Sequence, residues 1–162
     1  MVENKKNSVD ILLVGNNPME MSVIYEKLQK YKRGILDASI TFELKGLLNK
    51  IIKLKPKSIV IDDKYGQEEL KSVINALLRN AKTKHIPITL IKNSNHAEGV
   101  DIGADDYVLK NNLSAIELFA SIKNAVKFRA TRNYLNQTYN KHSGILGGAM
   151  NRLSRFKSAA SL

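Results

Sequence analysis

The chain has 162 residues, enough for one domain with a sizeable hydrophobic core, and its formal charge of +11 indicates an anionic partner or a solvated basic surface. The absence of cysteine excludes disulfide bonds, thiolate metal sites and a cysteine nucleophile. Because residues 1–8 are polar and no run reaches the ~20 apolar residues of a membrane-spanning helix, we expect a cytoplasmic protein without a transmembrane segment.

Five apolar runs of strand length alternate with helical patterns along the chain, as expected for repeated βα units around a parallel sheet. Several of these runs are continuously apolar, which is typical of strands that helices cover on both faces. The expected strands are residues 9–14, 35–38, 58–61, 86–91 and 106–109.

Helical spacing of apolar residues predicts the connecting helices. Asn17 can cap the first helix, Pro18 suits its first turn, and Glu20 can complete a capping box. The expected buried stripes are Met21, Ile24, Leu28 and Tyr31, then Leu44, Leu47, Leu48 and Ile51, then Leu70, Val73, Ile74, Leu77 and Leu78. Between residues 92 and 103 a fourth helix has room only for a short or irregular segment.

The last helix is expected to begin at a second capping box, Ser114 to Glu117, and to continue past the domain body. Its packing stripe is predicted to be Ala115, Leu118, Phe119, Ile122 and Val126. The glycines at 144, 147 and 148 are expected to end it. The predicted organisation is therefore an N-terminal tail (1–8), a domain (9–127), a helical extension (128–142) and a basic tail (143–162).

Polar residues gather where the predicted strands end, which is where open parallel sheets place their sites. Gly15 and Asn16 follow the first strand, Asp62 ends the third, Lys92 follows the fourth and Lys110 follows the fifth. Together with the strings Gly103-Ala-Asp-Asp-Tyr-Val-Leu-Lys110 and His85-Ile-Pro-Ile88, these segments resemble response-regulator receiver (CheY-like) domains over residues 9–127. The resemblance implies a flavodoxin-like α/β fold: a five-stranded parallel sheet of order 2-1-3-4-5, with helices on both faces and an extended C-terminal helix.

Carried over by position, the resemblance places Asp62 at the phosphoacceptor, Lys110 at the lysine that pairs with the phosphoryl group, and Lys92 and Tyr107 at the switch positions. Where the family has two acids that hold Mg²⁺, this chain has Gly15 and Asn16. A hard cation thereby loses its preferred carboxylates, so Mg²⁺ binding is expected to be lost or weak, with no other cofactor. Phosphoryl transfer relies on such a metal, so it should nearly cease.

Three interpretations of the pocket remain open. In the first, Asp62 and Asp63 form a salt-bridge cluster with Lys92 and Lys110, with Lys64 nearby, that imitates a metal-bound state. In the second, these are leftover polar residues at a solvated strand edge. In the third, Asp63 still attracts a weakly bound cation and Asp62 retains some phosphorylation.

The sequence also resembles the second, degenerate receiver of PleD-type response regulators, an adaptor for dimer formation, whose exit helix looks like residues 128–139. We therefore expect a non-catalytic pseudo-receiver that binds signalling proteins, such as a histidine kinase or another response regulator, and that forms a homodimer through Phe128, Leu135 and Tyr139. The alternatives are an Asp62-phosphorylated single-domain regulator, or a basic protein that binds nucleic acid or a membrane surface through its C-terminal tail.

Overall fold

The computed structural model describes residues 10–31, 36–93 and 102–159. The chain divides into two compact units, Met1–Arg129 and Ala130–Leu162, and each is described by itself. Within the described ranges, no helix combines the length and the apolar character needed to cross a membrane.

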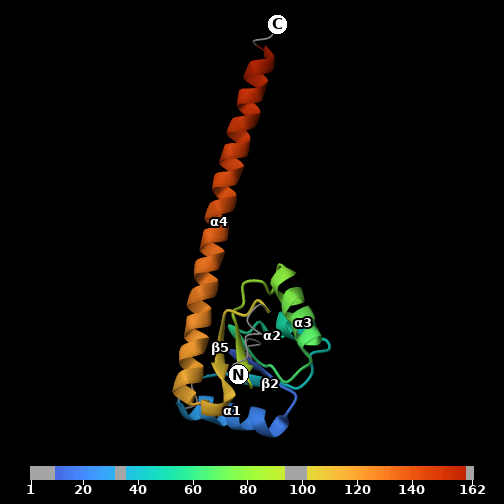
Figure 1. Cartoon of the computed structure of the whole chain (residues 1–162), viewed down its shortest axis with the longest axis vertical. Helices are drawn as coiled ribbons and strands as arrows, with labels where there is room; N and C mark the ends of the chain where they lie inside the picture. Colours follow the sequence, from blue (N-terminus) through green and yellow to red (C-terminus); the bar gives the residue numbers. More distant parts are fainter. Residues whose placement is uncertain (1–9, 32–35, 94–101, 160–162) are drawn as a thin grey trace, which may run out of the picture. The chain divides into compact units, whose positions relative to one another are not determined.

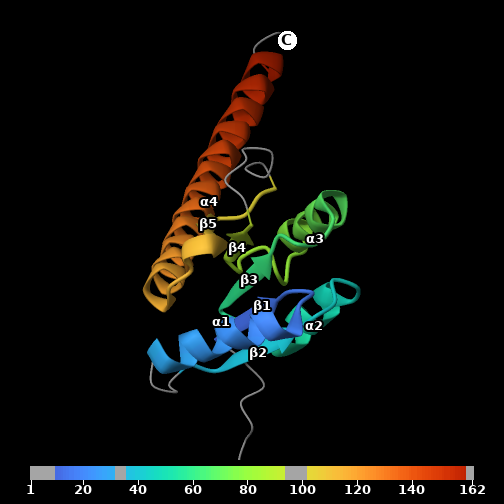
Figure 2. The same ribbon diagram turned by 60° about the horizontal axis from the view of Figure 1, so that its bottom comes forward.

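The first unit is built on a five-stranded sheet in which every neighbouring pair is parallel. Its strands lie in the order β2-β1-β3-β4-β5, as predicted (Figure 2). Because all the strands are parallel, the carboxyl ends of β1, β3, β4 and β5 lie at the same edge of the sheet. The strands are β1 (Ile11–Val14), β2 (Ala38–Thr41), β3 (Ser58–Asp62), β4 (Ile88–Lys92) and β5 (Asp106–Leu109).

Helices cover both faces of this sheet (Figure 1). Successive strand residues point to opposite faces, so Leu12 and Val14 join one core with α2 and α3. Ile11 and Leu13 join a second core with α1 and the start of α4. The helices are α1 (Pro18–Tyr31), α2 (Leu47–Leu54), α3 (Gln67–Arg79) and α4 (Ala115–Ala159), with a short 3-10 turn, η2 (Lys110–Asn112), before α4.

Three strands begin later than the sequence predicts, and the first of them begins at Ile11 instead of residue 9. The second was expected at residues 35–38, but pairing with β1 starts at Ala38, because the carbonyl of Asp37 accepts the N–H groups of Asp10 and Ile11. The fourth was expected from residue 86, but the N–H of Ile86 bonds to the carbonyl of Thr83 and closes a turn instead. The expected short fourth helix falls largely on residues 94–101, outside the described residues.

The predicted helix caps form, with one difference. Asn17 Oδ1 accepts the N–H groups of Met19 and Glu20 at 3.1 and 3.3 Å, while the carboxylate of Glu20 turns toward two lysines instead of closing a capping box. Tyr31, predicted to be buried, is 43% exposed and stacks in a tilted geometry on Phe119. The box of Ser114 and Glu117 is complete, with both reciprocal hydrogen bonds at 3.1 Å.

The predicted end of the last helix near residue 143 is wrong, because α4 runs on to Ala159. Gly144, Gly147 and Gly148 lie within it, and none has the positive φ that would end a helix. Each glycine costs roughly 1 kcal/mol of helix propensity relative to alanine, which lowers helix stability without breaking it. Residues 143–159 are therefore helical, not a separate tail.

Candidate functional site

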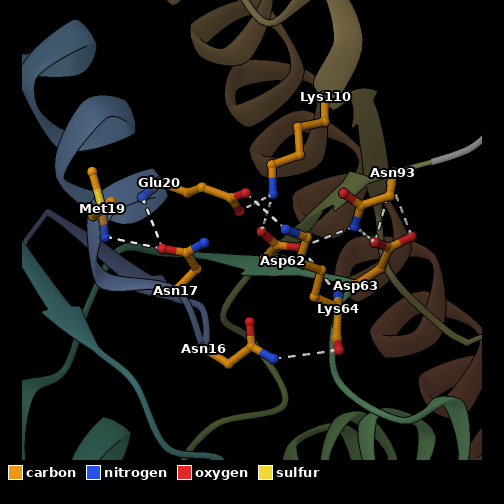
Figure 3. Close-up of polar contacts among 9 residues, drawn as sticks. All are labelled: Asn16, Asn17, Met19, Glu20, Asp62, Asp63, Lys64, Asn93 and Lys110. Atoms are coloured by element: carbon orange, nitrogen blue, oxygen red, sulfur yellow. Dashed lines mark hydrogen bonds and ion pairs between the residues drawn. The ribbon is translucent and has the colours of Figure 1, made fainter.

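The carboxylate of Asp62, the last residue of β3, lies at the centre of a polar cluster and has no exposed surface (Figure 3). Its Oδ2 accepts a hydrogen bond from Lys110 Nζ at 2.8 Å, which is the ion pair predicted from the sequence. Its Oδ1 accepts the backbone N–H of Lys64 at 3.0 Å and the Nδ2 of Asn93 at 3.2 Å. Both oxygens of this carboxylate are thus engaged by groups of the chain itself.

Glu20, in the first turn of α1, supplies a second carboxylate to the cluster. Its two oxygens bind Lys110 Nζ and, at 2.7 Å, Lys64 Nζ. Lys110 therefore bridges Asp62 and Glu20, and ties the end of β5 to both β3 and α1. The hydrogen bond from Lys110, and then that from Lys64, hold the pKa of Glu20 below its ordinary value. Burial alone would lower the pKa of Lys110, but its hydrogen bonds to Asp62 and Glu20 outweigh burial and raise it.

Asn93, the residue after β4, joins the ends of β3 and β4. Its backbone N–H lies 3.1 and 3.2 Å from the two carboxylate oxygens of Asp63, and its side-chain Nδ2 contacts both Asp63 and Asp62. The N–H of Asp63 in turn donates to the carbonyl of Ile91 in β4. Asp63 is thus fixed in the cluster mainly by Asn93.

Lys92 takes a different place from the one predicted. Its side chain is buried, and its Nζ lies 5.1 Å from the centroid of the Tyr107 ring, a cation–π distance. The cation on Asp62 is therefore Lys110, and Lys92 and Tyr107, at the positions that resemble the family's switch residues, pack against each other. Tyr107 itself remains 48% exposed.

The positions that resemble the family's metal-binding acids hold no carboxylate. A Cβ added at Gly15 would overlap with the Sδ of Met21, a fully buried side chain, so the space above Gly15 is filled. Asn16 is exposed and its Nδ2 lies 3.4 Å from the carbonyl of Lys64. In the described part of the chain, no group of three or more His, Cys, Asp and Glu side chains could hold a metal ion. Of the carboxylates present, those of Glu20 and Asp62 are bound to lysines, and that of Asp63 is bound to Asn93.

Comparisons with known proteins bear on the fold. No family model matches the sequence, and no curated protein does. Among solved structures, a response regulator from Desulfuromonas acetoxidans is 21% identical, with a TM-score of 0.61 over 74% of this chain and 97% of that one. A putative response regulator from Chloroflexus aurantiacus is 19% identical, with a TM-score of 0.60 over 74% of this chain and 98% of that one. A CheY-like receiver domain protein from Methanospirillum hungatei is 17% identical, with a TM-score of 0.58 over 77% and 98%.

The chain therefore has the receiver fold. Its topology supports that statement independently, because the strand order and the cover of helices on both faces match those expected of this fold. In the receiver fold of this chain, the predicted residues Asp62, Asp63, Lys64 and Lys110 come together at one strand edge.

Sequence reasoning missed two members of the cluster, Glu20 and Asn93. Glu20 was interpreted as a capping residue, although the first turn of a helix that directly follows a strand end faces the same edge as that strand end. Asn93 was not considered, because its neighbour Lys92 was assigned to the position that resembles a family site residue. Both residues could have been predicted from their positions in the sequence, because each lies close to the end of a strand.

Proposed function

We propose that this chain is a pseudo-receiver: a non-catalytic adaptor that binds proteins of bacterial two-component signalling and does not act as a phosphorylation-driven switch. The observation that supports this proposal most is that groups of the chain itself bind both carboxylate oxygens of Asp62. Its buried carboxylate accepts three hydrogen bonds from the chain, one of them from the Lys110 ammonium group. The chain's own lysine thus supplies the positive charge beside Asp62.

Charge balance in the cluster argues against a phosphorylated Asp62. Glu20, Asp62 and Asp63 carry three negative charges, and Lys64 and Lys110 carry two positive ones. Phosphorylation replaces the single negative charge of the Asp62 carboxylate by a charge between about −1.5 and −2 at neutral pH, next to two remaining carboxylates and without a metal to neutralise it. A receiver with a full acid pair avoids this repulsion by binding Mg²⁺, but Gly15 and Asn16 supply no carboxylate for it.

Partner binding is the activity that remains for such a module. We propose a histidine kinase or another response regulator as the partner class, a cytoplasmic location, and a homodimer formed through the exposed stripe of α4. Leu135 and Tyr139 in that stripe are 59% and 72% exposed. An isolated helix with exposed apolar residues is marginal in water, which favours burial of this stripe against a second copy.

The test is incubation with acetyl phosphate and Mg²⁺, followed by intact-mass measurement. We expect no phosphoryl adduct on the full chain, and none on an Asp62→Asn control, under conditions in which a receiver with both acids is modified. An adduct that disappears in Asp62→Asn would instead establish a phosphorylated single-domain regulator, the competing function. A parallel Mg²⁺ titration followed by the amide signals of Asp62 and Asp63 should show no saturable shift.

A further inference from the structure

The edge of the sheet opposite the Asp62 cluster carries two apolar hollows rimmed by lysines. The first hollow, of about 430 Å³, has apolar walls that include Ile11, Leu36 and Ile122, and its rim carries Lys57, Lys123 and Lys127. The second hollow, of about 400 Å³, has walls that include Ile51, Ile52 and Ile86, and its rim carries Lys55, Lys82 and His85. Both volumes suit one or a few bulky side chains each.

The two hollows lie on either side of the segment of residues 55–58, because Ile11 and Ile122 of the first belong to the core with α1 and α4, whereas Ile51 and Ile86 of the second belong to the core with α2 and α3. The surface described below comprises both hollows and this segment. Lys55 and Pro56 line the second hollow, and the next residues, Lys57 and Ser58, line the first. This segment leads into β3, whose other end is Asp62. With a rise of about 3.3 Å per residue, the surface lies roughly 13 Å from the Asp62 cluster along the strand. It is therefore a separate site from the cluster described above.

This surface is strongly basic. The described residues that line the two hollows include five lysines and one acid, Asp10. Asp10 Oδ1 lies 2.6 Å from the Nζ of Lys57, whose side chain is nevertheless 76% exposed. Lys55, Lys82 and Lys123 are also exposed. Charges gathered around a concave apolar surface raise the local concentration of anionic partners, so complementarity requires negative charge on the occupant.

The shape of the surface selects among anionic occupants. Its apolar floor is recessed: Ile11, Ile51, Ile86 and Ile122 are each at most 5% exposed. A membrane-binding surface would need apolar side chains that protrude into the lipid. A single-stranded nucleic acid would need aromatic faces for its bases, but the walls are mostly aliphatic and the ring of Phe119 already stacks on Tyr31. Recessed aliphatic hollows suit inserted aliphatic anchors of a peptide.

We propose that this surface binds an acidic, amphipathic peptide segment of a partner protein. Aliphatic side chains of the segment enter the two hollows, and its Asp and Glu residues pair with the lysines of the rims. The inference rests on the proposed function as an interaction module, and names the chemistry of the partner and where it binds. It does not depend on the phosphorylation state of Asp62, since the two sites lie at opposite ends of β3.

The test starts with the selection of a random phage-displayed peptide library on the immobilised full chain. Enriched peptides are synthesised, and their affinities are measured by fluorescence anisotropy. We expect enriched peptides to combine several Asp or Glu with two aliphatic anchors. Lys55→Glu with Lys57→Glu should weaken their binding at least about tenfold, because like charges then face each other. The matched control is Lys45→Glu with Lys71→Glu, two lysines that line neither hollow, and it should change binding little.

A second variant separates shape from charge. Val126, which is 44% exposed and lines the first hollow, can be replaced by tryptophan without changing any charge. The filled hollow should weaken peptide binding while circular dichroism stays unchanged. The proposal is overturned if enriched peptides lack acids, or if they bind both charge-reversed variants equally. It is also overturned if no peptide is enriched and the lysine substitutions weaken only the binding of phosphatidylglycerol vesicles or single-stranded DNA. Failure of the proposed function would appear separately, as a phosphoryl adduct on Asp62.

Discussion

Replacing Lys110 by methionine is the most direct test of the internal ion pair. The substitution keeps the approximate length and the apolar stem of the side chain but removes the ammonium group that bridges Asp62 and Glu20. Asp62 would then be a fully buried carboxylate without a cation, because the side chain of Asp62 has no exposed surface. Glu20 would keep Lys64 at 2.7 Å and partial exposure. The loss should therefore fall mainly on Asp62.

Breaking a buried ion pair by removing one partner costs about 3–5 kcal/mol. Asp62 keeps two hydrogen bonds, from the N–H of Lys64 and from Asn93, so we expect the lower end, about 3 kcal/mol. Asp62→Asn should cost less, about 1–2 kcal/mol, since the amide still accepts hydrogen bonds and Lys110 keeps Glu20. The double variant should cost less than the sum of the two, with a coupling of about 1–2 kcal/mol.

Urea unfolding followed by circular dichroism measures these free energies, and an unchanged slope shows that the variants unfold over the same surface. Lys71→Met, at an exposed position of α3, is the matched control and should change stability little. A loss below about 1 kcal/mol for Lys110→Met, or strict additivity in the double variant, would show that the pair contributes as little as a surface salt bridge.

Three further predictions concern other parts of the chain. Burial raises the pKa of the Tyr65 phenol from 10.0 to about 12. The stabilisation that accompanies this shift is complete below pH 10.0 and is lost as the pH rises toward 12. A titration of phenolate absorbance should show one late-titrating tyrosine, which should be absent in Tyr65→Phe. Arg129→Leu should cost about 3–5 kcal/mol in thermal or urea unfolding, because the buried Asp105 loses its guanidinium partner, and a change below about 1 kcal/mol would contradict this. Sedimentation should show self-association of the full chain but a monomer for a shortened chain that ends at Asn133, and equal masses would exclude the part of α4 beyond residue 133 as the interface.

The fold followed from the sequence because its signals are short-range and repeated. The continuous apolar runs specify buried parallel strands, and β5 was predicted with the bounds Asp106–Leu109 that the structure has. The stripe residues Met21, Ile24 and Leu28 are all buried. The errors lie at boundaries, as at β2, because the residue at which strand pairing starts depends on hydrogen bonds to β1 that no local pattern encodes.

The site was predictable only in part. The pairing of Asp62 with Lys110 follows from their places at strand ends that share one edge of the sheet, and it is present. Whether Lys92 turns toward Asp62 or toward Tyr107 depends on how a long side chain packs, and position alone does not determine it. Likewise, Arg129 contributes to the positive charge that indicates a solvated basic surface, yet it is buried and donates to Asp105 through Nε and through Nη2 at 2.6 Å. Charge counting cannot reveal a buried ion pair between segments far apart in the chain.

Gly15, at a position that resembles a metal-binding acid, leads to a last prediction, because a side chain there would meet its surroundings. Met21 occupies the space that a side chain at position 15 would need, because an added Cβ would overlap with its Sδ and lie 2.8 Å from its Cγ. The double variant Gly15→Asp with Asn16→Asp should therefore be destabilised by overpacking and should bind Mg²⁺ poorly. Adding Met21→Ala removes the obstruction.

In the triple variant, two carboxylates join Asp62 at the edge of the sheet, which is the oxygen-rich donor set that Mg²⁺ prefers. We expect a saturable shift of the Asp62 and Asp63 amide signals in a Mg²⁺ titration of the triple variant only. Lys110 still holds Asp62, so the binding should be weak, and it should strengthen when Lys110→Met is added and the carboxylate of Asp62 is released from its cation. Equal Mg²⁺ binding by the double and triple variants would show that Met21 does not obstruct the site. Saturable binding by the unaltered chain would show that its remaining carboxylates suffice.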